Sequence, residues 1–218
     1  MKNPPLFLRA VNLINGLFIV FLASIIWVPA TIAAEPNTSQ IQLIKKMKQG
    51  GLVIFMRHAS TIKKQIDARP IDLKDCEKQR NLSDQGRKEA LLVGQSFAKH
   101  SIPVSEVISS PFCRCKDTAE LAFNTFNTFK IDNNLFYSIG LPPEERKNKT
   151  AALADMLSTI PVSGNRVIIS HTSNLKEATG IWPQVEGAVY VFNPSNNHPP
   201  EFLGSIKPSD WQSLELFL

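Results

Sequence analysis

The sequence predicts an α/β domain with three layers, in which a mainly parallel central sheet is flanked by helices. Two observations lead to this prediction. Strand-like runs containing Val and Ile occur at residues 52–56, 106–110 and 166–170. Segments with helical periodicity lie between them, and strands that alternate with helices typically form a parallel sheet covered on both faces. With 218 residues, 43% of them hydrophobic, the chain can form one substantial core.

The first half of the domain carries three expected helices. Ile41, Ile44 and Met47 have helical spacing, and a pair of glycines then stops the helix. Ser83 is expected to cap the second helix, which carries apolar residues along one face. The third helix follows the second strand directly. These helices are expected at residues 38–49, 83–99 and 112–126.

The second half of the domain continues the alternation. The third strand runs into a short helix that Gly180 closes. No internal repeat and no second domain are visible in the sequence. The remaining expected elements are strands at residues 188–194 and 201–206 and a C-terminal helix at 208–217.

The N-terminal 34 residues are expected to be a signal peptide that precedes the domain at 35–218. Lys2 and Arg9 form a short basic region, residues 11–28 are almost entirely apolar, and "PATIAAEPN" supplies small residues for cleavage after Ala33 or Ala34. An uncleaved anchor is the alternative, because 18 apolar residues nearly suffice to cross a bilayer. Either way the domain is expected outside the cytoplasm, in the periplasm or secreted, with a membrane contact only if the segment is retained.

Composition argues against several other classes of protein. The net charge is +5, but the Lys and Arg residues are spread along the chain, and the run "KKMK" is best explained as a solvated helix face. Nucleic acid is therefore not an expected partner. The four histidines lie far apart and the three cysteines lack zinc-site spacing, so neither a metal nor a cofactor is expected.

Basic side chains follow three of the expected strands. Arg57 and His58 end the first strand, Arg114 comes shortly after the second, and His171 follows the third. Each has an ordinary structural explanation on its own. In open α/β sheets, however, ligands bind beyond the carboxyl ends of the strands. Guanidinium groups and helix N-termini there would suit a phosphate dianion, so the joint pattern indicates a phosphate site.

Four motifs in order resemble the histidine phosphatase superfamily, also called phosphoglycerate mutase-like. They are "MRHAST", "LSDQGRKEA", "ISSPFCRCKDTAEL" and "VIISHTSNL". The resemblance covers about residues 52–194 and implies the mutase-like fold. It is closest to a small exported branch, whose "DCxxQRNLSDxGR" and "SPxCR" are matched here by "DCEKQRNLSDQGR" and "SPFCR".

This resemblance implies that the protein is a phosphomonoesterase acting on phosphorylated small molecules without a metal. His58 would attack phosphorus and form a phosphohistidine, while Arg57, Arg114 and His171 hold the phosphoryl oxygens. The chemistry is consistent with these roles. A neutral imidazole is a good nucleophile near neutral pH, and phosphoryl transfer depends mostly on positioning and charge stabilisation.

A leaving alkoxide also needs a proton donor. The phytase-like branch places an Asp after the second histidine, but Thr172 stands there in this sequence. Glu186, which resembles part of a Glu-Gly pair of the exported branch, is the first choice for the acid. Glu144 and Glu145, between the second and third strands, are the alternatives.

Three further positions carry expectations. Arg80 and Asn81, just before the second helix, are expected either to touch the substrate or to have capping and surface roles. Ala59 replaces the usual Gly after the histidine, and it should be tolerated if the backbone there is not at positive φ.

The cysteines are expected to form one disulfide. Cys76 and Cys113 stand in the two motifs that flank the site, so we predict that they pair and leave Cys115 free. Two other functions remain open at this level. The same pocket would serve a phosphomutase if water were kept out, although export argues against this. A non-catalytic phosphate-binding module would keep the pocket without turnover.

Overall fold

The computed structural model describes residues 38–125, 129–196 and 199–214. The predicted signal peptide, residues 1–34, and the last residues of the predicted C-terminal helix lie outside the described residues. Within those described ranges, no helix has the length and apolar character needed to cross a membrane.

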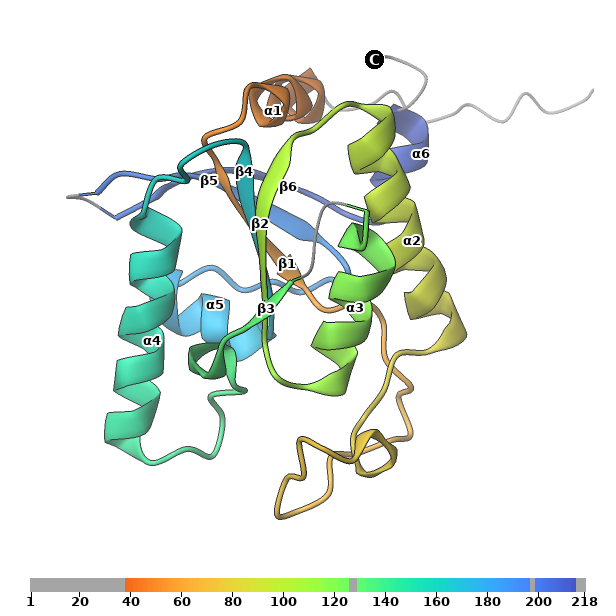
Figure 1. Cartoon of the computed structure of the whole chain (residues 1–218), viewed down its shortest axis with the longest axis vertical. Helices are drawn as coiled ribbons and strands as arrows, with labels where there is room; N and C mark the ends of the chain where they lie inside the picture. The colour runs from red at the N-terminus through yellow and green to blue at the C-terminus, as the bar shows by residue number, and fades with distance from the viewer. Residues whose placement is uncertain (1–37, 126–128, 197–198, 215–218) are drawn as a thin grey trace, which may run out of the picture. The chain divides into compact units, whose positions relative to one another are not determined.

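One six-stranded sheet forms the centre of the described domain (Figure 1). Its strands lie in the order β3-β2-β4-β1-β5-β6. The first four strands of the chain run parallel to one another. At one edge, β5 pairs antiparallel with β1, and β6 pairs antiparallel with β5. The predicted mainly parallel sheet is therefore confirmed. The strands are β1 (Val53–Arg57), β2 (Val104–Ser109), β3 (Lys130–Ile131), β4 (Asn165–Ser170), β5 (Val189–Asn193) and β6 (Glu201–Ile206).

Helices cover both faces of the sheet, as the three-layer prediction requires. In Figure 1, α2 and α3 lie on one side of the strands, and α4 and α5 lie on the other. The helices are α1 (Thr38–Gln49), α2 (Asp84–Lys99), α3 (Cys113–Phe123), α4 (Pro143–Ser158), α5 (Thr172–Thr179) and α6 (Asp210–Leu214), and two short 3₁₀ turns are η1 (Cys76–Lys78) and η2 (Asn133–Leu135).

The alternation of side chains along β1 divides the core into two layers. Successive residues of a strand point to opposite faces of the sheet. Ile54 and Met56 pack in the cluster that includes residues of α1, α2, α3 and α6. Val53 and Phe55 pack in the second cluster, with residues of α4 and α5. Because both faces are buried, β1 reads as a continuous apolar run.

The helix α4 was not predicted from the sequence. Only Leu153 and Leu157 of its 16 residues are buried, so it shows little apolar periodicity. Its start nevertheless carries two recognisable signals. Pro143 occupies the first turn and two glutamates follow it, and both features favour a helix N-terminus.

Candidate active site

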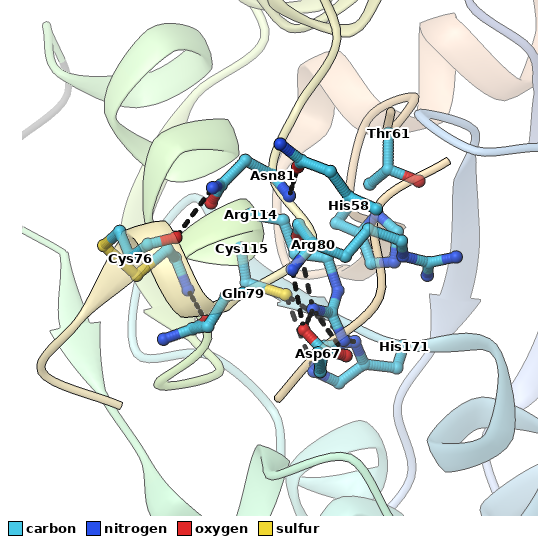
Figure 2. A network of polar contacts seen from close by, with 12 residues as sticks. His58, Thr61, Asp67, Cys76, Gln79, Arg80, Asn81, Arg114, Cys115 and His171 are labelled. Atoms are coloured by element: carbon cyan, nitrogen blue, oxygen red, sulfur yellow. Dashed lines mark hydrogen bonds and ion pairs between the residues drawn. A yellow bond between two sulfur atoms is a disulfide. The ribbon is translucent and has the colours of Figure 1, made fainter. Parts of the chain in front are cut away.

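The carboxyl ends of β1 and β4 bring together two imidazoles that the sequence places after strands, His58 and His171. Arg57 lies beside Ser170 in the parallel ladder, and the His58 amide donates to the Ser170 carbonyl oxygen at 3.0 Å. The next residue on β4's side is His171. The two imidazole centroids consequently lie 5.5 Å apart, at the edge of the sheet where the pattern placed a site (Figure 2).

His58 is buried and has a defined tautomer. Its side chain belongs to a residue that is only 2% exposed, and Nδ1 lies 2.9 Å from the Ala59 carbonyl oxygen. A carbonyl oxygen only accepts, so Nδ1 carries the proton and Nε2 keeps its lone pair. Burial, followed by the charge of Arg114, holds the pKa of His58 well below its ordinary value. The ring is therefore a neutral imidazole with a free nucleophilic nitrogen.

His171 is also buried and neutral. Its Nε2 lies 2.9 Å from the Ser110 hydroxyl, and its Nδ1 lies 3.5 Å from Nη2 of Arg114. Because a guanidinium can only donate, the Nδ1 lone pair faces Arg114 and the Nε2–H donates to Ser110. Burial, then Arg114, lowers the pKa of His171 well below its ordinary value.

Arg114 is held in the first turn of α3 by an acidic partner that the sequence did not reveal. The residue is 1% exposed, and its Nη1 donates to Asp67 Oδ1 at 2.9 Å. Its guanidinium carbon also lies 4.4 Å from the centroid of the Phe112 ring. Asp67 in turn accepts from the Arg80 backbone amide at 2.9 Å. Figure 2 shows Asp67 gathered with Arg80, Arg114 and His171.

Arg57 has a second carboxylate partner, Glu186. The Arg57 Nη2 and Glu186 Oε1 atoms are 3.1 Å apart, and Nη1 of Arg57 donates to the carbonyl oxygen of Gln184 at 2.6 Å. Glu186 also accepts from the Thr61 hydroxyl at 3.1 Å and from the Thr61 amide at 3.2 Å. The predicted acid therefore lies beside the residue that precedes His58.

Three guanidinium N–H groups at this site are buried without a hydrogen-bond partner among the described residues. They are the Nε atoms of Arg57, Arg80 and Arg114. Leaving a buried donor unsatisfied is unfavourable, so such groups are uncommon in folded proteins. An anion with several acceptor oxygens, such as a phosphate, would supply the acceptors that these donors lack.

Of the remaining predicted residues, one lines the cavity at this site and the others do not. Arg80 lines a cavity of about 490 Å³ together with Arg57, His58 and His171. Asn81 instead holds a neighbouring loop, because its amide nitrogen donates to the Cys76 carbonyl oxygen at 2.7 Å. The alternative acids, Glu144 and Glu145, are exposed in the first turn of α4.

The loop after His58 is fixed by residues of two helices. The Ala59 amide donates to the Thr118 hydroxyl at 3.1 Å, and that hydroxyl donates to the Arg114 carbonyl oxygen at 2.7 Å. A Cβ added at Gly86 would overlap the Ser60 carbonyl group, so only glycine lets α2 approach this loop. Ser83 caps α2 through the Gly86 amide, as predicted.

The alanine at position 59 is accommodated without strain. Among the described residues other than glycine, Ser101 alone has positive φ, so Ala59 needs no left-handed conformation. Its methyl group packs in a small apolar cluster with Leu82 and Ala90. The expectation that this departure is harmless to the local backbone is confirmed.

The predicted cysteine pairing is confirmed. Cys76 and Cys113 form a disulfide that connects η1 to the first residue of α3. Cys115 is free and buried, with its sulfur 3.7 Å from Nε2 of His171. Burial raises the pKa of the Cys115 thiol to about 12, so the group is a neutral thiol.

Two neutral imidazoles and buried arginines thus lie at the carboxyl edge of a mainly parallel sheet, in a fold of the phosphoglycerate mutase-like class. A family model described as "Histidine phosphatase superfamily (branch 1)" matches residues 53–135, a range that includes His58 and Arg114. This part of the chain is therefore similar to the histidine phosphatase superfamily.

Solved structures confirm the fold. The protein histidine phosphatase SixA complexed with tungstate is similar with a TM-score of 0.53 and 19% identity, over 73% of this chain and 98% of that chain. Phosphoserine phosphatase from Entamoeba histolytica has a TM-score of 0.52 and 15% identity, with the same coverage of 73% and 98%. At these identities the likeness concerns the fold. No curated protein matches the chain in sequence.

Proposed function

We propose that the protein is an exported, metal-independent phosphatase that hydrolyses phosphomonoesters of small molecules through a phosphohistidine on His58. The observation that carries the proposal is the combination of a free Nε2 lone pair on His58 with three unsatisfied guanidinium donors around it. The match of residues 53–135 to the family model of the histidine phosphatase superfamily supports phosphatase chemistry. The disulfide supports export, because disulfides persist mainly in oxidising compartments.

The reaction proceeds in two displacements. In the first, Nε2 of His58 forms a bond to phosphorus while the bond from phosphorus to the ester oxygen breaks, and the alcohol leaves with a proton from a carboxylic acid. In the second, water attacks phosphorus, the N–P bond breaks, and the same carboxylate takes the proton of the water. Arg57 and Arg114 stabilise the equatorial oxygens in both steps, and His171 does so with its Nε2–H, which then exchanges the Ser110 hydroxyl for a phosphoryl oxygen.

The proton donor in the proposal is Glu186, which contacts the arginine beside the nucleophile. Asp67 is the second candidate, because it contacts the other phosphate-binding arginine, Arg114. A dianionic phosphate on either arginine would favour the protonated form of its neighbouring carboxyl group. Glu144 and Glu145 have weaker support, since both are exposed on α4.

The enzymatic proposal is tested with p-nitrophenyl phosphate, with and without EDTA. Turnover that EDTA leaves unchanged and that His58→Ala abolishes is expected. Rapid quenching in base should also trap a phosphoryl group on His58, because phosphohistidine is stable in base and labile in acid. Phosphate binding without turnover on any ester would favour the non-catalytic module instead. Transfer to an added alcohol in preference to water would favour a mutase.

The proton donor is identified by changing the leaving group. A p-nitrophenolate ion can leave without being protonated, whereas an alkoxide needs a proton from an acid as it leaves. We expect Glu186→Gln to reduce kcat on an alkyl phosphate far more than on p-nitrophenyl phosphate. Asp67→Asn is the competing variant and Glu145→Gln is the control. If only Asp67→Asn shows the leaving-group dependence, the acid is Asp67.

Export is tested separately, by cell fractionation and by sequencing the N-terminus of the mature protein. A mature chain that begins after Ala33 or Ala34, in the periplasm or medium, is expected. An intact N-terminus in the membrane fraction would support the anchor, and an intact N-terminus in the cytoplasm would contradict export.

A further inference from the structure

A second, larger cavity adjoins the cavity that contains the two imidazoles. Its volume is about 920 Å³, and two segments form its walls, residues 65–71 and 136–141. The two cavities share Arg80, Tyr137 and Ile139 among their lining residues. They are therefore parts of one groove that leads away from the phosphate site.

The lining of this groove combines three arginines with a larger number of apolar residues. Arg80 and Arg114 lie at the end that meets the phosphate site, where Asp67 neutralises one of the two charges. Gln65 and Arg69 also line the groove, and the other lining residues are apolar. They are Ile66, Ala68, Pro70, Ile71, Phe136, Tyr137, Ile139, Gly140 and Leu141.

Large apolar side chains are exposed around the groove. Ile66 is 84% exposed and Ile139 is 56% exposed. Trp182, which lines the first cavity, is 54% exposed. Single exposed apolar residues are ordinary on a protein surface, but a group of them around a polar cavity is typical of a binding site.

We propose that this groove binds the alcohol part of the substrate, and that the substrate is a phosphomonoester of an apolar, chain-like alcohol. This inference rests on the proposed function, because the phosphate end of the substrate must reach His58. The charge pattern favours this occupant over a docked protein. Arg114 is only 1% exposed, so a slender anionic group reaches it while a folded surface does not. An amphiphilic phosphomonoester satisfies both ends of the groove at once.

The inference is tested with a series of straight-chain alkyl phosphates, from ethyl to decyl, below their micellar concentrations. Each methylene that enters the groove should raise kcat/KM by about fourfold, from the free energy of burying a methylene group. The double variant Ile66→Ser with Ile139→Ser should flatten this dependence, so that decyl phosphate loses a larger factor in kcat/KM than ethyl phosphate does. Ile131→Ser, at a 46% exposed position on β3, is the matched control.

Several outcomes would overturn the inference while leaving the proposed function intact. One is hydrolysis of p-nitrophenyl phosphate with a rate that stays flat or falls as the alkyl chain grows. Another is a concentration-dependent dimer that the double variant abolishes in sedimentation velocity, since the groove would then bind a second copy. Binding of ethyl and decyl phosphonate, measured by calorimetry, tests the groove even if no ester is turned over. Equal affinities for the two phosphonates would contradict the proposal.

Discussion

Arg114 combines a permanent charge with nearly complete burial, and this combination determines what its removal does. Arg114→Ala takes away the partner of Asp67 and the phosphate contact that we propose for Arg114. We expect kcat/KM on p-nitrophenyl phosphate to fall by at least about 100-fold, the usual effect of removing a group that stabilises transition-state charge. Steady-state kinetics measure this directly.

Arg87 provides a matched control for Arg114. It also pairs with an aspartate, Asp117, at 3.0 Å, but its side chain is 47% exposed. Exposed ion pairs contribute little to stability. Arg87→Ala should therefore change neither kcat/KM nor the unfolding midpoint appreciably. Comparable losses in the two variants would mean that Arg114 acts only through stability.

The two neutral imidazoles make stability depend on pH. The pKa values of His58 and His171 are lowered in the folded protein, mainly by burial. Their contribution to stability is fully present above the pKa of an unfolded histidine, about 6.5. As the pH falls below this value, the unfolded chain binds protons that the folded site excludes. The unfolding free energy should then decrease by up to about 1.4 kcal/mol per pH unit for each histidine.

Urea unfolding at a series of pH values between 5 and 7.5 checks this dependence. His171→Asn removes one of the titrating groups, so its unfolding free energy should fall less steeply below about pH 6.5. A variant and a parent protein with identical slopes would show that the imidazole at 171 does not resist protonation.

The basic residues of the site were predictable because each is tied to a strand end. Arg57, His58 and His171 directly follow apolar runs that the sequence makes visible, and parallel pairing of β1 with β4 then brings them together. Asp67 gave no such sign. It lies in a polar loop, and its pairing with Arg114 depends on the conformation of that loop. A loop without apolar periodicity gives no sign of its conformation in the sequence.

At the scale of elements, the closest approach of α2 to the site depends on one glycine. A Cβ at Gly86 would overlap the Ser60 carbonyl, whereas a Cβ at Gly94 would overlap the Ala122 carbonyl on α3. Gly86→Ala should lower stability by about 1–3 kcal/mol, as overpacking does. It should also reduce kcat/KM because it displaces the loop after His58.

Gly94→Ala separates these two effects. It should carry a similar loss of stability, since it also pushes a helix away from a neighbour, but it disturbs the contact between α2 and α3 two turns from the loop. At a temperature where both variants are folded, kcat/KM should fall only in Gly86→Ala. Thermal unfolding and kinetics on the same samples provide the comparison, and equal kinetic losses would refute the local explanation.

The elements differ in how clearly the sequence encodes them. The strands β1 and β4 are buried on both faces and read as short apolar runs. By contrast, α4 buries only Leu153 and Leu157, because its other residues face solvent or the edges of the layer. A helix that packs through so narrow a stripe is recognised by its first turn, with Pro143 and the glutamates after it.

At the scale of the whole molecule, one disulfide links the loop ahead of α2 to the start of α3. Cys76 and Cys113 are 37 residues apart, and closing a loop of this length stabilises a protein by about 4 kcal/mol in the chain-entropy description. Replacing both cysteines by serine should lower the unfolding free energy by roughly this amount. Chemical denaturation without reductant measures it, and an unchanged midpoint would contradict the expectation.

The free thiol beside His171 offers a built-in reporter on this domain. Cys115 is fully enclosed and its proton is held tightly, so an alkylating reagent can reach it only when α3 moves away from the strand edge. The rate at which this single sulfur is labelled would therefore record how often the region around His171 opens. Slower labelling in the presence of inorganic phosphate would show, without any turnover, that the anion closes the region around it.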